Sequence, residues 1–247
     1  MLTALLSLVT RHSFCYSIPR RPGVSGRGKS FKMMTFEDFG ARVASVWQGL
    51  MPSTRSLVER ALKGVPSLAG AGAAAAARKS RPDSIYDARS EWELSRLLAA
   101  LDERAAEKGS TVLSVEQACE LSRLTETCAA VLHVEARSAE VFAQLLERAL
   151  RSHDYARVDE LAGTISTRLA PSEVCEMARN PHPAVRAIAN EALLQAPTAV
   201  LIGLLGDPVD ADVARTALEG QADEYDSEEA RWIVNALEQA DASEEDI

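Results

Sequence analysis

The chain has 247 residues, of which 47% are hydrophobic, 26% are charged and only 5% are aromatic. This length allows one substantial domain with an appendage, or two small domains. The formal net charge of −9 is unevenly distributed, because residues 1–82 contain 13 Lys or Arg and 3 Asp or Glu, whereas residues 83–247 contain 14 and 33. An acidic body repels phosphate, so the charge disfavours nucleic acid as a partner.

Cysteine usage and hydropathy indicate an intracellular compartment. Cys15, Cys119, Cys128 and Cys175 show no spacing typical of a disulfide framework, so we expect free thiols in a reducing cytosol. No segment approaches the roughly 20 apolar residues that a membrane span needs. The apolar start MLTALLSLV lacks a preceding basic region and a clean cleavage site, which disfavours a secretory signal. We therefore expect a cytoplasmic protein.

Residues 1–33 form a basic extension with six Lys or Arg and no acidic residue. The run PRRPGVSGRGKS within it is rich in turn-forming residues and cannot bury enough apolar surface to fold, so we expect disorder. One interpretation is a transit peptide, which would make the protein organellar. The other is an extension upstream of a true start at Met33 or Met34.

Residues 34–68 are predicted to form an amphipathic helical arm. Apolar residues recur at helical spacing, and Pro52 divides the segment into two helices. Phe36, Phe39 and Trp47 could tether the protein to a membrane surface or to a partner's groove. The alternative is an arm that packs weakly on its own domain. An Ala/Gly linker is expected at residues 69–82.

Residues 83–240 are predicted to form an all-α domain. We expect helices that begin at two capping boxes, at a serine and at an aspartate: Ser90 to Glu93, Ser114 to Gln117, about Ser138, and Asp154. Connections of a few residues predict antiparallel neighbours. The last helix is expected from Ser227 to about Gln239, followed by a frayed acidic tail at 241–247.

Residues 171–222 contain two segments of equal length that open with proline and close with Gln-Ala. In the first, the turn Asn180-Pro181 precedes a helix with Val185 and Arg186. In the second, the turn residues and the valine at a spacing of 28 are Asp207, Pro208 and Val213, but Ala214 stands in the arginine's place.

This pattern resembles the HEAT repeat, in which an Asp/Asn-Pro turn precedes a helix that begins with Val-Arg. The resemblance implies a short α-solenoid of antiparallel helix pairs, with the partly disordered N-terminal arm appended. It also implies that Arg186 bonds across to turns of neighbouring units, or alternatively contacts a ligand. A weaker likeness to uncharacterised bacterial proteins with HEAT-like units rests on Val213-Ala214-Arg215 and implies a bacterial cytoplasmic origin.

The sequence contains no catalytic motif that we can identify. There is no nucleophile elbow and no glycine-rich phosphate loop. The best metal candidates, Cys119, Cys128 and His133, are spread over several helical turns and do not converge, so we expect no metal and no cofactor. His182 is expected to be an exposed turn residue.

These observations predict a non-catalytic scaffold or adaptor that binds a protein partner through its stacked helices, with the basic arm as a tether. Peripheral membrane contact through the arm stays open, as does the oligomeric state. One alternative is a HEAT-like enzyme or enzyme accessory of the lyase type, with no identifiable active site. Another is a switch in which the basic arm and the acidic body bind each other.

Overall fold

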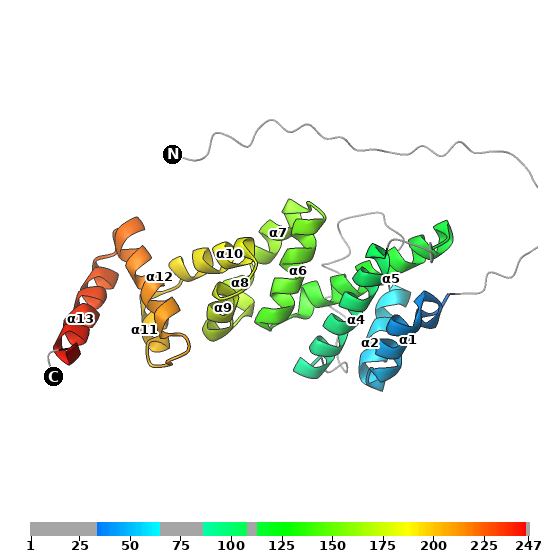
Figure 1. The fold of residues 1–247 in the computed structure, drawn as a ribbon, viewed down its shortest axis with the longest axis horizontal. Helices are drawn as coiled ribbons and strands as arrows, with labels where there is room; N and C mark the ends of the chain where they lie inside the picture. The colour runs from blue at the N-terminus through cyan, green and yellow to red at the C-terminus, as the bar shows by residue number, and fades with distance from the viewer. Residues whose placement is uncertain (1–33, 65–85, 108–112, 246–247) are drawn as a thin grey trace, which may run out of the picture. The chain divides into compact units, whose positions relative to one another are not determined.

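The computed structural model describes residues 34–64, 86–107 and 113–245. Within these ranges the chain forms twelve α-helices, one short 3-10 helix and no strand, which confirms the all-α fold class (Figure 1). None of the described helices has by itself the length and apolar character of a membrane span. The predicted extension at 1–33 and the predicted linker at 69–82 lie outside the described residues.

Three long helices form the centre of the core: α4 (Ala88–Ala106), α5 (Val115–Glu135) and α6 (Ala139–Arg151). Each contacts the other two. The predicted apolar stripe of α4 is completely buried at Leu94, Leu97, Leu98 and Leu101, whereas Ala105, in the last turn of the helix, is exposed. The largest side chains of α5 and α6 that join this core are Leu121, Leu132, Phe142 and Leu146.

Three of the four predicted helix beginnings agree with the structure, including that of α6, whose N-cap is Ser138. Ser114 and Gln117 form the expected capping box of α5, and Asp154 caps the next helix by accepting from the Arg157 amide at 3.2 Å. The prediction for Ser90 is wrong, because α4 begins earlier and Asp87 accepts from the Ser90 amide at 2.7 Å. The aspartate provides the stronger cap, since the glutamate needed for a box at Ser90 is engaged elsewhere.

The single helix predicted after Asp154 is two helices, α7 (Tyr155–Ala162) and α8 (Ile165–Arg168). The break falls at Gly163 and Thr164. The Thr164 hydroxyl donates to the Leu161 carbonyl at 2.9 Å, so a side chain competes there with the helical backbone ladder. The apolar positions on either side of the break nevertheless remain buried.

The N-terminal segment packs on the central helices. It consists of η1 (Phe36–Phe39), α1 (Ala41–Gly49) and α2 (Pro52–Gly64). Helix α1 contacts α4, and α2 contacts both α4 and α5. Gly40, with a φ of 108°, joins η1 to α1 in a conformation that other residues rarely adopt. Of the two interpretations of this segment, the structure shows the one in which it packs on its own domain.

The C-terminal part contains two helix pairs and a last helix. The first pair is α9 (Pro171–Ala178) with α10 (Pro183–Leu194), and the second is α11 (Thr198–Leu204) with α12 (Ala211–Glu224). Equivalent helices of the two pairs touch, since α9 contacts α11 and α10 contacts α12. Helix α13 (Glu228–Glu245) packs on α12 and continues beyond Gln239, because no glycine or proline interrupts the sequence there.

Candidate functional site

The two repeat turns share one hydrogen-bond pattern. The Asn180 side-chain oxygen accepts from the His182 amide at 2.8 Å, and the Asp207 carboxylate accepts from the Val209 amide at 2.9 Å. Both are turns in which a short polar side chain binds the backbone two residues later. The two turns therefore have equivalent hydrogen bonds from side chain to backbone. His182 itself is half-buried rather than exposed, because it is the N-cap of α10.

The helices after these turns align differently from the spacing read in the sequence. Each of the two helices has three buried positions, and each position in α10 lies 29 residues before the corresponding one in α12. They are Val185, Ala189 and Leu193 in α10 and Ala214, Leu218 and Ala222 in α12. In this alignment Arg215, and not Ala214, corresponds to Arg186, and both arginines are half-buried. Each of the two helices therefore has an arginine directly after its first buried residue. The spacing of 28 misses the second of these because the second unit has two extra residues between its turn and its first buried position.

Arg186 has a different role from the one expected. Arg186 donates to the carbonyls of Asn180 and Pro181 at 2.9 and 2.8 Å, so it braces the turn of its own unit. Arg179 makes the contact between units, donating to the Val209 carbonyl at 3.0 Å and to the buried Asp210 carboxylate at 2.9 Å. The prediction that Arg186 bonds across the stack is wrong, since the neighbouring arginine does so.

Two buried glutamates of α4 bind the N-terminal ends of two other helices. Glu93 accepts from the Met51 amide at 3.0 Å and from the Thr54 hydroxyl at 2.6 Å, at the start of α2. Glu91 accepts from the amides before α6 and from a hydroxyl there: Arg137 and Ser138, both at 2.9 Å, and the Ser138 hydroxyl at 2.7 Å. Free amide groups at a helix N-terminus favour a carboxylate, which explains why both glutamates can be buried.

The C-terminal ends of helices are bound in the same way by donors from neighbouring elements. Arg168 donates to the carbonyls of His133 and Ala136 at the end of α5, both at 2.5 Å. Gln221 of α12 donates to the carbonyls of Leu194, the last residue of α10, and of Ala196 just after it, at 3.0 and 2.7 Å. Side chains from one helix therefore bind the ends of other helices at several places in the described chain. Sequence reasoning missed these contacts because a single Arg, Gln or Glu on a helix is usually solvated.

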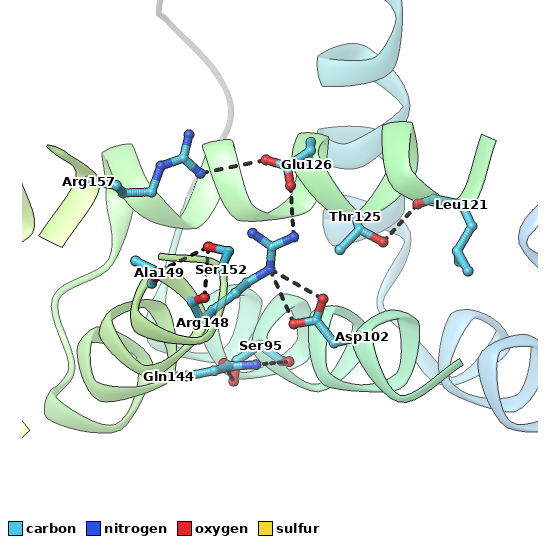
Figure 2. A network of polar contacts seen from close by, with 10 residues as sticks. All are labelled: Ser95, Asp102, Leu121, Thr125, Glu126, Gln144, Arg148, Ala149, Ser152 and Arg157. Atoms are coloured by element: carbon cyan, nitrogen blue, oxygen red, sulfur yellow. Dashed lines mark hydrogen bonds and ion pairs between the residues drawn. The ribbon is translucent and has the colours of Figure 1, made fainter. Parts of the chain in front are cut away.

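A further polar network lies where α4, α5, α6 and α7 meet (Figure 2). Arg148 Nε lies 3.2 Å from each carboxylate oxygen of Asp102, and its Nη2 donates to Glu126 at 2.8 Å. Arg157 reaches the other oxygen of Glu126 at 3.6 Å. The hollow beside these side chains has a volume of about 260 Å³ and is also lined by Ser152.

The electrostatics of this network indicate a structural role. Burial alone would lower the pKa of Arg148, but its hydrogen bond to Glu126 and the charge of Asp102 outweigh burial and raise the pKa. The guanidinium therefore stays charged and is held by carboxylates of the same chain. Because Arg148 is already paired with Asp102 and Glu126, it can act neither as a general acid nor as a free binding site for an anion.

The buried thiols are not nucleophiles. Burial, with a smaller effect of Asp102, raises the pKa of Cys128 to about 12, and burial together with Asp210 raises the pKa of Cys175 to about 11. Both thiols are protonated at neutral pH. Among the described residues no group of three His, Cys, Asp or Glu is arranged to hold a metal, and His133 lies beside Glu160 at 3.2 Å.

The three proposed tether residues lie together at the N-terminal end of the body. Phe39 is completely buried and Phe36 is nearly so. Trp47 stacks on Phe36 with ring centroids 4.0 Å apart and is half-buried. A tether through these rings would require the segment to leave the core.

Comparison of the chain with protein-family models, with curated proteins and with solved structures finds no match. The arrangement of its own residues is therefore the basis for any functional conclusion. That arrangement consists of helix ends bound by neighbouring side chains, two related turns, and the buried thiols of Cys128 and Cys175.

Proposed function

We propose that the chain is a non-catalytic, cytoplasmic interaction scaffold built as a short α-solenoid of HEAT-like helix pairs. The observation that carries the proposal is the contact between equivalent helices of consecutive pairs, α9 with α11 and α10 with α12. Stacking of this kind buries the faces between units and leaves the outer faces open for a partner. The bond from Arg179 to Asp210 fixes the spacing between the two units.

The second unit offers the partner an apolar surface. Helix α11 has the sequence TAVLIGL, yet only Leu201 is buried. Ile202 is 42% exposed and Val209, in the following turn, is 67% exposed. A short apolar helix with one buried residue gains little from its own fold, whereas burial of these side chains by a partner would contribute about 1.5–3 kcal/mol each. We place the partner surface at α11 and the turn after it.

The basic extension serves as the tether in this proposal. The segment with Phe36 and Trp47 is packed on α4 and α5. The tethering role predicted for the whole arm therefore falls to residues 1–33, which contain basic residues and no acidic residue. An acidic protein partner or an anionic lipid headgroup has the complementary charge.

Affinity purification of the tagged full chain from its own cells tests the proposal. The double variant Ile202→Glu and Val209→Glu places two charges on the proposed partner surface. Val115→Glu is the matched control, because Val115 is 78% exposed at the start of α5, away from this surface. We expect the double variant to lose a protein that the wild type and the control both retain, with unchanged circular dichroism. Recovery of the same proteins by all three would contradict the proposal.

A further inference from the structure

Helix α13 carries Trp232 on the side that is turned away from the core. With 3.6 residues per helical turn, residues two positions apart lie on nearly opposite sides of a helix. Two positions before Trp232 is Ala230, a core residue, and two positions after it is Val234, which packs against the core. Trp232 is accordingly 73% exposed, more than any other described aromatic residue. The described fold therefore leaves one whole face of its indole open.

Trp92 in α4 shows how this chain covers an exposed indole. The guanidinium carbon of Arg96, four residues after Trp92, lies 4.6 Å from the ring centroid. A second cation, Arg89, stands three residues before Trp92. A guanidinium is attracted by the face of an indole, and its edge can at the same time pair with a carboxylate. Helix α4 thus supplies its own tryptophan with a cation.

The equivalent positions of α13 hold no cation. Ala236 stands four residues after Trp232, and Glu228 and Glu229 stand four and three residues before it. Residues at these spacings are neighbours on the surface of a helix. Both glutamates are exposed, and neither forms an ion pair in the described part of the chain, although the charge of Glu228 also acts on Arg231. The Trp232 face, made of Trp232, Ala236 and these two glutamates, therefore combines an open ring with two open carboxylates.

The surroundings of the Trp232 face are also acidic. Residues 223–240 contain six Asp or Glu, all exposed, and one basic residue, Arg231. This arginine is engaged, because it donates to Asp226 at 2.7 Å and to the Ala222 carbonyl at 3.0 Å. An apolar partner would bury carboxylates without a counter-charge, and a second copy of the chain would bring the same carboxylates together in a symmetric contact. A cationic partner avoids both penalties.

We propose that the Trp232 face binds an arginine-rich segment of another protein. One arginine of the segment stacks on the indole, as Arg96 does on Trp92, and donates at the same time to a glutamate of the face. Arginine fits better than lysine, because a guanidinium is planar and more weakly hydrated than an ammonium group. The inference goes beyond the proposed partner surface at α11, since it rests on α13 alone and holds whether or not α11 binds a partner.

Fluorescence anisotropy with the full chain tests the proposal. The probe is a fluorescein-labelled peptide of alternating glycine and arginine, which is compared with lysine and glutamate versions of the same length. Of the two test variants, Trp232→Ala removes the ring, and Ala236→Arg supplies the missing cation from α13 itself. The matched control is Ala240→Arg, which adds the same charge to the same helix at an exposed position. This position is eight residues from Trp232 and is not its neighbour on the helix surface.

We expect the arginine peptide to bind the wild type at about 0.15 M NaCl, and both test variants to bind it at least about fivefold more weakly. The control variant should bind within about twofold of the wild type, because an added surface charge has a small effect. The lysine peptide should bind more weakly than the arginine peptide, and the glutamate peptide should not bind.

Several results would overturn the proposal. One is no binding of the arginine peptide, and another is equal affinity of the wild type and Trp232→Ala for it. Equal affinity for the arginine and lysine peptides, or equal weakening by Ala236→Arg and Ala240→Arg, would reduce the interaction to unspecific charge attraction. A wild-type dimer in sedimentation equilibrium that dissociates in Trp232→Ala would assign the face to a second copy of the chain instead.

Discussion

Helices α4 and α13 have similar lengths, 19 and 18 residues, but very different surroundings. Helix α4 contacts α1, α2, α5 and α6 and buries nine residues, whereas Ala230 is the only buried residue among the described side chains of α13. Their acidic residues differ in the same way. Glu91 and Glu93 are buried at the ends of neighbouring helices, whereas Glu228 and Glu229 face solvent. Neighbouring elements, and not composition, decide what a glutamate does in this chain.

The largest expected difference between the two helices is in apolar packing. Leu98→Ala removes a completely buried side chain from α4 and should lower the free energy of unfolding by about 3–4 kcal/mol. Leu237→Ala makes the same change at a half-buried position of α13 and should cost less than about 1 kcal/mol. Urea denaturation of both variants measures the difference. Equal costs would refute the contrast between the two helices.

The next largest effect concerns the carboxylate at the start of α6. Glu91→Ala leaves two amides and one hydroxyl without their acceptor, so we expect a loss of about 2–3 kcal/mol in the free energy of unfolding. Glu140→Ala removes an exposed carboxylate from the first turn of the same helix and should cost about 0.5 kcal/mol. Similar losses in the two variants would mean that Glu91 acts only through its charge.

Glu93 should make stability depend on pH. Burial alone would raise the pKa of Glu93, but hydrogen bonds from Thr54, Met51 and Arg89 outweigh it and lower the pKa below its model-compound value of 4.5. A lowered pKa contributes stability above the unfolded value, and this contribution is lost as the pH falls through the folded value. Thermal denaturation should therefore show a smaller acid-induced decrease in Tm for Glu93→Gln than for the wild type. An identical decrease would exclude this role.

The smallest expected effect distinguishes two helical glycines of the second unit. Gly203 in α11 has no atom within 4 Å of an added Cβ, so Gly203→Ala should raise the free energy of unfolding by about 0.5–1 kcal/mol through helix propensity. At Gly220 in α12 an added Cβ would lie 2.4 Å from Leu194 Cδ2, so this leucine must move. Gly220→Ala should gain nothing, and an equal gain at both sites would show that the pair is loosely packed.

The sequence predicted what depends on local chemistry. The leucine stripe of α4, the capping box at Ser114 and the two Asx turns were all readable, because each involves residues within a few positions of one another. Contacts between helices could not be predicted from the sequence. Arg179 and Arg186 both border the first turn, and only the structure shows which of them reaches Asp210. The same holds for Glu91 and Glu93, whose hydrogen bonds to the starts of other helices span 39 or more residues, although the spacing of Ser90 and Glu93 fits a local capping box.

The exposure of the candidate surface residues also depends on contacts between helices, so the sequence did not predict it. Phe36 and Phe39 have the spacing of an amphipathic membrane or partner helix, but the fold uses them as core residues. Trp232 lies within the last helix that the sequence predicts, but the periodicity of this helix does not reveal that the ring is 73% exposed. The degree of burial of an aromatic residue depends on which helices pack beside it, so it cannot be read from one segment.

Native-state hydrogen exchange of the full chain tests most directly whether α4 and α13 differ in local stability. Peptides from α4 should exchange only through global unfolding. Peptides from α13 should exchange at least about tenfold faster, which corresponds to about 1.4 kcal/mol less protection. Equal protection of α4 and α13 would contradict the account, because the open C-terminal helix would then be as firmly held as the one that four helices surround.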